Sequence, residues 1–162
     1  MKHILTFTAL LLAPLTALHA AGLSPDEDAQ RMGRYNVVWN GPSKDATGVM
    51  PIGNGDIAAG VYAIENGDLF LLLSKNDAFS FSGEIYKTGR VRVSLDPNPF
   101  KPGKPFRQTL DLPTGSIQIE ADGVTFRVWA DMQRAVYHVE IAAPRTIAVS
   151  VRPEFWKRLD KT

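Results

Sequence analysis

The chain has 162 residues, of which 44% are hydrophobic and 22% are charged, and its formal net charge is +1 at pH 7. This length suits one domain, and the near-neutral charge argues against a nucleic-acid partner, because nucleic-acid-binding domains have a basic surface. The absence of cysteine excludes disulfides, thiolate metal sites and cysteine nucleophiles.

Residues 1–20 have the pattern of a secretory signal peptide. The start is charged at Lys2, residues 4–18 are largely apolar, and small residues around Ala20 offer a cleavage site. The apolar part is too short, and too interrupted by Thr and Pro14, for a membrane span. We therefore expect a secreted or periplasmic protein with no membrane span once the signal is removed. The alternative is an N-terminal core helix.

Signal cleavage would leave the mature chain with little metal-binding capacity. It would remove His3 and His19, so that His138 alone would remain. A multi-histidine zinc site or a Ser-His-Asp triad with a spare histidine is therefore not expected. Removal of Lys2 would also bring the 18 basic residues level with the 17 acidic ones. We expect no metal and no cofactor.

Residues 21–34 are polar and are predicted to be a tether before the folded domain. Within them, Ser24 has the chemistry of a helix N-cap, and Pro25 is typical of a first helical position. A short helical turn is expected there.

From residue 35 onward, short apolar runs alternate with turn residues. Asn66-Gly67 between two apolar runs is a strong hairpin signal, and Asp122-Gly123 has similar turn chemistry. Eight or nine short strands without a long helix predict an all-β antiparallel sandwich over residues 35–162. The expected strands are residues 35–39, 57–64, 69–73, 90–95, 106–112, 116–121, 124–130, 135–142 and 146–151.

Side-chain alternation assigns the inward faces of several strands. Residues 69–73 are apolar without alternation, which predicts a strand covered on both faces. His138 and Glu140 are predicted to share an outer face. The residues predicted to point inward are Ile117, Ile119, Tyr137, Val139, Ile141, Ile147, Val149 and Val151.

The segment MPIGNGD at residues 50–56 is a glycine-rich loop placed before a predicted strand. Glycine permits positive φ angles and close approach of another backbone or a ligand. A phosphate site would require a following helix, and Val61 stands where a P-loop requires lysine, so nucleotide binding is not expected. The alternative to a ligand loop is a tight turn packed against a neighbouring surface.

A second polar segment, SKND at residues 74–77, follows a buried strand. Its side chains could line a sugar site with Phe79 or Phe81 stacking, or they could cap the turn. The spacing of the acids picks out no pair of the kind that a glycosidase needs. A tryptophan at 39, 129 or 156 could stack on a sugar, but lone tryptophans of sandwiches more often belong to the core.

Taken together, six segments in order resemble the N-terminal domain of a secreted bacterial family related to glycoside hydrolase family 95, the α-L-fucosidase-type enzymes. The closest resemblance is to a branch of unknown function in which SKNDAF replaces the fucosidase pattern Leu-Asn-Glu-Asp-x-x-Trp. This departure leaves no basis for assigning a fucose substrate. The segments are Trp39, MPIGNGD at 50–56, NGDL at 66–69, LSKNDAF at 73–79, GRVRV at 89–93 and QTLDLPTGSI at 108–117.

The resemblance implies a super-sandwich domain that precedes a catalytic (α/α)6 barrel and works in glycan breakdown. The catalytic residues would lie on that barrel, so none is assigned here, and we expect this sandwich to be truncated at its C-terminal end. A free-standing carbohydrate-binding module using Phe79, Phe81 or Trp129, or a non-catalytic structural fragment, is the alternative. The candidate binding or interface residues, facing a glycan or the barrel, are Gly53, Asn54, Gly55, Asp56, Lys75, Asn76, Asp77 and Phe79.

Overall fold

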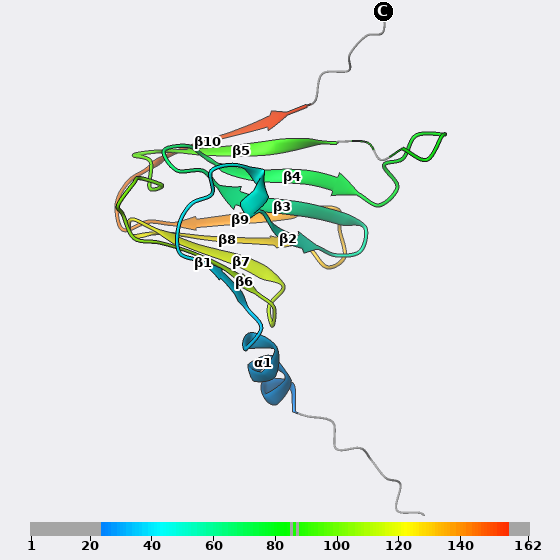
Figure 1. Cartoon of the computed structure of the whole chain (residues 1–162), viewed down its shortest axis with the longest axis horizontal. Helices are drawn as coiled ribbons and strands as arrows, with labels where there is room; N and C mark the ends of the chain where they lie inside the picture. The colour runs from blue at the N-terminus through cyan, green and yellow to red at the C-terminus, as the bar shows by residue number, and fades with distance from the viewer. Residues whose placement is uncertain (1–23, 85, 87, 156–162) are drawn as a thin grey trace, which may run out of the picture.

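The computed structural model describes residues 24–84, 86 and 88–155, and shows two antiparallel five-stranded sheets packed face to face (Figure 1). The expected antiparallel β-sandwich is therefore confirmed. The predicted signal peptide and Trp156 lie outside the described residues.

Both sheets are built from antiparallel neighbours. In spatial order, the first sheet contains β1 (Val37–Trp39), β6 (Phe106–Asp111), β7 (Ser116–Ala121), β8 (Val124–Ala130) and β9 (Tyr137–Ala142). The second sheet contains β10 (Ala148–Glu154), β5 (Gly89–Asp96), β4 (Leu69–Lys75), β3 (Ile57–Ala63) and β2 (Met50–Gly53).

Strand β2 was not among the strands expected from the sequence. It has four residues, and Pro51 lies within it, opposite Gly60 of β3. Proline cannot donate to a sheet ladder and is tolerated on edge strands, and β2 is the edge of its sheet. The glycine loop is consequently the turn of a β2–β3 hairpin.

The predicted tether contains the helix α1 (Pro25–Gly33), and a 3₁₀ turn, η1 (Ala46–Gly48), precedes β2. Ser24 is the N-cap, as predicted, because its hydroxyl accepts a hydrogen bond from the Glu27 amide. The Glu27 carboxylate in turn accepts a hydrogen bond from the Ser24 amide at 2.8 Å, which completes a capping box. No residue of α1 is buried, so local capping rather than packing defines this helix.

The core lies between the two sheets, and its predicted inward faces are largely confirmed. Ile117 and Ile119 are fully buried, and Tyr137, Val139 and Ile141 pack against the core. The core also contains one buried polar side chain that joins the sheets: Gln108 of β6 donates from Nε2 to the carbonyl of Val61 in β3, at 3.2 Å. A buried amide is tolerated because it is hydrogen-bonded.

The start of β4 is covered on both faces, as predicted. Leu69 and Leu71 face the core, while Phe70, on the outer face, is also buried. The Phe70 ring stacks on Tyr62 at 5.3 Å, and the guanidinium groups of Arg90 and Arg92 lie over it at 4.6 and 4.8 Å.

Val149 and Val151 lie on the predicted face of their strand, but they are not buried. They lie opposite the buried Leu95 and Val93 of β5, yet their exposed fractions are 47% and 61%. Their side chains share the face of the sheet that lines the core, but β10 is the edge strand and lacks equivalent cover from the first sheet. Ile147, just before β10, is partly buried against the core.

Candidate functional site

Three loops meet at one end of the sandwich, on the right in Figure 1. They are the turn between β2 and β3, the segment that follows β4, and the turn between β8 and β9. We call their joined polar residues the loop cluster, which consists of Asn54, Asp56, Lys75, Asn76, Asp77, Asp131 and Arg134.

Asn54 is the centre of the loop cluster. Its Oδ1 accepts hydrogen bonds from the amides of Asp56 and Ile57 at 3.0 and 2.9 Å, which shapes the β2–β3 turn. Its Nδ2 donates to the carbonyls of Asp131 and Arg134 at 2.6 and 3.1 Å. One side chain thus closes its own turn and ties it to a loop about 80 residues away.

The two glycines beside Asn54 are needed for different physical reasons. A Cβ on Gly53 would lie 2.8 Å from the carbonyl oxygen of Ile57, so the close approach is to the chain's own backbone. Gly55 has a φ of 95°, a conformation that other residues rarely adopt, while the space around its Cα is open.

Lys75 connects the second loop to the first. Its Nζ lies 2.9 Å from Asp56 Oδ1 and 2.8 Å from Asp77 Oδ1. The hydrogen bonds to Asp77 and then Asp56 raise the pKa of Lys75, and the bond from Lys75 lowers the pKa of Asp77. Asn76 adds two bonds to the turn, from its side chain to the Gly55 carbonyl and from its amide to the Asp56 carbonyl.

Asp131 anchors the third loop, and the sequence analysis did not single it out. Its Oδ2 accepts a hydrogen bond from the Arg134 guanidinium at 2.8 Å, and Oδ1 accepts one from the Gln133 amide at 3.0 Å. His138 Nε2 lies 3.2 Å from Oδ2. The bond from Arg134, then those from Gln133 and His138, hold the pKa of Asp131 far below its ordinary range.

Tyr137 fixes this loop to the second sheet. Its hydroxyl donates to the Ala58 carbonyl at 2.7 Å and also lies 3.3 Å from the Ser74 carbonyl. Burial raises the pKa of the Tyr137 hydroxyl further above neutral pH, where a tyrosine hydroxyl is already a protonated donor. The neighbouring His138 stays on the outer face, as predicted, where it stacks on Trp129 at 4.8 Å.

The structure therefore brings together the predicted residues from Gly53 to Asp56 and from Lys75 to Asp77. Phe79 is the exception: only its amide joins the segment, by donating to the Asp77 carbonyl, and its ring is exposed. Asp131 and Arg134 were missed because loop residues show no periodicity that predicts which distant turn they contact.

The carboxylates of the loop cluster are paired with basic side chains, which holds the loops in place. Asp56 and Asp77 share Lys75, and Asp131 is paired with Arg134 and His138. A glycosidase general acid requires a raised pKa, whereas the pKa values of Asp77 and Asp131 are lowered. In the described part of the chain, no group of three or more acidic or histidine side chains could hold a metal ion.

The family model DUF5703_N, described as a domain of unknown function (DUF5703), matches residues 38–162. The chain therefore belongs to this family. No curated protein and no solved structure has significant similarity to the chain. Within the described residues, no helix is long and apolar enough to cross a membrane.

The two glycines of the β2–β3 turn provide a test of its geometry. We expect Gly55→Ala to destabilise the fold by about 1–2 kcal/mol because of its positive φ, and Gly53→Ala to cost about 1 kcal/mol or more through its clash with Ile57. Gly41→Ala is the control, because nothing lies within 4 Å of its added Cβ. Urea unfolding measures the free energy of unfolding of the three variants. Equal stabilities in all three would contradict the described backbone geometry of the turn.

The lowered pKa of Asp131 predicts a pH dependence. Because the folded-state pKa lies below that of the unfolded chain, the stabilisation is present above about pH 4 and is lost as the pH falls further. Asp131→Asn should therefore reduce stability at neutral pH and flatten the loss of stability between about pH 4 and pH 2. Urea unfolding over a pH series measures this effect, with Asp26→Asn on the exposed α1 as the single-charge control. Parallel wild-type and Asp131→Asn profiles would contradict the prediction.

Proposed function

We propose that this chain is the N-terminal β-sandwich domain of a secreted, glycoside hydrolase-like protein that breaks down glycans. In this proposal the loop cluster fixes the position of the loops whose exposed apolar side chains dock against a catalytic (α/α)6 barrel. The sandwich supplies that surface and no catalytic group. The resemblance of six ordered segments to domains of this kind supports the proposal.

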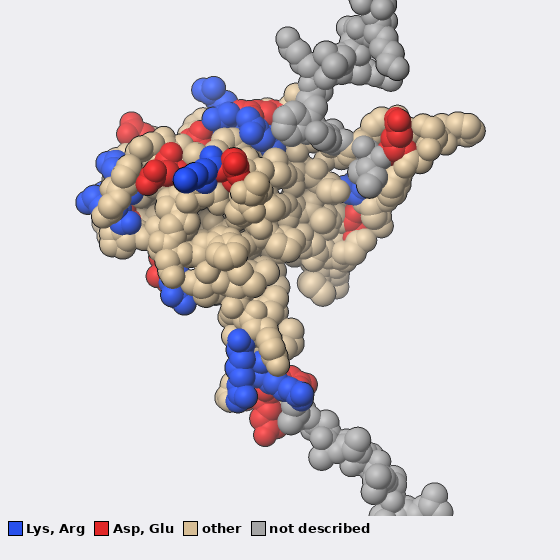
Figure 2. Space-filling view, viewed as in Figure 1, with Lys and Arg blue, Asp and Glu red and all other residues tan. Residues whose placement is uncertain are grey.

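The observation on which the proposal mainly rests is the exposed apolar surface at the loop-cluster end. Five large apolar side chains, contributed by two loops, are exposed there. Figure 2 shows that the loop projecting on the right is mostly uncharged. Exposed apolar groups at one end of a domain are typical of an interaction surface. The five residues are Phe79, Phe81, Tyr86, Met132 and Val136.

The loops that present these side chains are held in place beneath them. Val136 donates its amide to the Arg134 carbonyl at 2.8 Å and accepts from the Asp131 amide at 2.9 Å. Tyr86 donates its amide to the Ala78 carbonyl at 2.8 Å, which closes the base of the projecting loop. A surface whose loops are already ordered loses less conformational entropy on docking.

Secretion is the second part of the proposal, and it rests on the leader pattern of residues 1–20. Mass spectrometry of the mature protein from the periplasm or the medium should find an N-terminus at Ala21. A product that stays in the cytoplasm with Met1 intact would contradict this part.

The docking claim is tested with the helical segment that we expect the reading frame to encode downstream of Thr162. Mixed with this chain, that segment should form a complex by analytical ultracentrifugation, and Phe79→Ser with Phe81→Ser should weaken it by at least about tenfold. Val149→Ser with Val151→Ser is the control, because these exposed apolar residues lie on β10, outside the loop cluster. A frame that encodes no helical barrel would contradict the proposal.

An activity assay tests the absence of catalysis. The chain alone should release no sugar from aryl glycosides or neutral glycans. Sugar release that is lost in Asp56→Asn or Asp77→Asn would show that the loop cluster itself is catalytic and would overturn the proposal.

A glycan-binding role is a second candidate, and a polar groove outside the loop cluster favours it. The aromatic side chains predicted to stack on a sugar differ in whether their rings are free to do so. The Trp129 ring is engaged by His138 at 4.8 Å and by the Arg127 guanidinium at 4.9 Å, and Trp39 donates from Nε1 to the Gly48 carbonyl. Phe79 and Phe81 remain exposed.

A further inference from the structure

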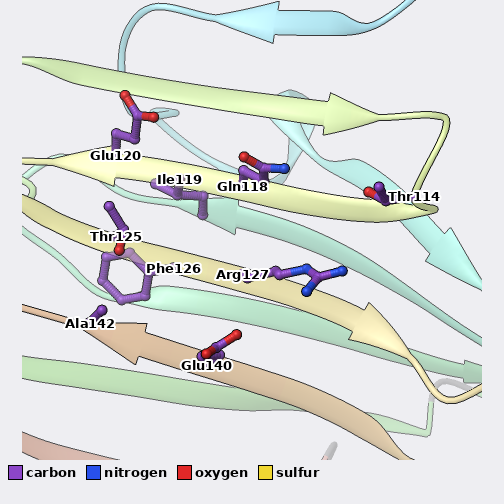
Figure 3. Close-up of a pocket in the computed structure, with 9 residues that line it drawn as sticks. All are labelled: Thr114, Gln118, Ile119, Glu120, Thr125, Phe126, Arg127, Glu140 and Ala142. Atoms are coloured by element: carbon purple, nitrogen blue, oxygen red, sulfur yellow. The ribbon is translucent and has the colours of Figure 1, made fainter. Parts of the chain in front are cut away.

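A groove of about 460 Å³ crosses the outer face of the first sheet (Figure 3). It lies on β7, β8 and β9, on the side of the sheet away from the core. Side chains of both charges and several neutral polar groups line it. The lining polar residues are Thr114, Gln118, Glu120, Thr125, Arg127 and Glu140.

The strand register places these side chains in rows across the sheet. Gln118 lies opposite Arg127, and Arg127 lies opposite Glu140. In the adjacent row, Glu120 lies opposite Thr125. Neighbouring strands are about 4.8 Å apart, so each row presents its side chains at a spacing of roughly 5 Å.

The charged groups of the groove form no ion pairs with one another. Within the described residues, no hydrogen bond or ion pair engages the carboxylates of Glu120 and Glu140. The Arg127 guanidinium lies over the Trp129 ring and pairs with no described carboxylate, although Glu140 is its direct cross-strand neighbour. Their hydrogen-bonding capacity is therefore available to a ligand.

The outer face of the second sheet provides the contrast. There Arg92 pairs with Glu154 at 2.6 Å and with Asp68 at 2.8 Å, and Arg90 also pairs with Glu154. Side chains that neutralise one another are what a passive sheet surface needs. The first sheet has charged residues at comparable positions, but Glu120 and Glu140 form no ion pair with a described residue there, so their oxygens are free to accept hydrogen bonds.

We infer that this groove binds a neutral oligosaccharide, a site that rests on the proposed role in glycan breakdown but is separate from the docking surface. Arg127, Glu140 and Gln118 are the residues assigned to the ligand hydroxyls. Gln118 already donates from Nε2 to Asp111 Oδ2 at 3.3 Å, so its Oε1 and its second Nε2 hydrogen are the groups that it offers. Arginine donates in a planar fork, carboxylates accept, and the amide does both, so the row matches the paired hydroxyls of a sugar ring.

The mixture of charges selects among ligand classes. A polyanion would be repelled by Glu120 and Glu140, which outnumber Arg127 in the groove. An uncharged polyhydroxyl ligand does not suffer this repulsion and can use donors and acceptors together.

Isothermal titration calorimetry of the full chain tests this site. The probes are cellohexaose, xylohexaose, mannohexaose and a heparin hexasaccharide. We expect saturable binding of at least one neutral hexasaccharide and none of the heparin probe. Arg127→Ala and Glu140→Gln should each weaken that binding by about tenfold, since the first removes a charged donor and the second replaces a charged acceptor by a neutral one.

The matched controls are Arg152→Ala and Glu65→Gln, which remove the same charges from exposed positions outside the groove and should leave affinity unchanged. Thermal unfolding checks each variant, and Arg127→Lys replaces Arg127→Ala if the latter is unfolded. No binding to any neutral probe, preference for heparin, or equal losses in the groove and control variants would overturn the inference. None of these outcomes bears on docking to a barrel, which is read from complex formation.

Discussion

The hydrogen bonds of Asn54 hold together the end of the molecule that we assign to interaction. This side chain uses its oxygen to close the β2–β3 turn and its nitrogen to hold the Asp131 and Arg134 carbonyls. An amide is suited to this position because it accepts at its oxygen and donates twice from its nitrogen, whereas a carboxylate has no donor and a hydroxyl has only one. Gly53 and Gly55 give the turn the backbone that brings Asn54 into reach.

The ion pairs around Asn54 are secondary to this arrangement. Lys75 and its two aspartates are substantially exposed, and exposed ion pairs contribute little to stability. Their effect is local, because they fix where the segment after β4 leaves the sheet. The projecting loop with Phe79 and Phe81 begins there, so its position depends on the same turn that Asn54 closes.

Much of the fold could be predicted from the sequence because its signals are local. Asn66-Gly67 marks a hairpin, and the alternation around Ile117 and Ile119 identifies the buried face. The exposure of Val149 and Val151 could not be predicted in this way. Alternation identifies the face of a strand, whereas cover depends on the offset of the opposite sheet, which is a tertiary property.

The candidate site also has a part that local sequence signals predict and a part that depends on tertiary contacts. The residues from Gly53 to Asp56 and from Lys75 to Asp77 could be found because they end or begin strands and have turn chemistry. Asp131 could not be linked to them, since its partner Asn54 is 77 residues away and the contact uses a backbone carbonyl. The groove on the first sheet was also missed, because the sequence does not show that the carboxylates of Glu120 and Glu140 stay without an ion pair in the folded protein.

Two surfaces with different chemistry therefore result from one sandwich. The loop end is apolar and rests on a hydrogen-bonded base, which suits a protein partner. The outer face of the first sheet is polar and unpaired, which suits a hydroxyl-rich ligand. Their separation would allow one domain to hold a catalytic partner, as we propose, and also the glycan that we infer for the groove.

Amide hydrogen exchange of Asn54→Ala, compared with wild type and with Asn40→Ala, tests the central claim most directly. Asn40 is exposed, and no described hydrogen bond uses its side chain. If Asn54 holds the loops together, exchange should accelerate at residues 131–136 in Asn54→Ala and stay unchanged in the β7 and β8 core and in Asn40→Ala. Unchanged exchange at residues 131–136 in Asn54→Ala would contradict the account.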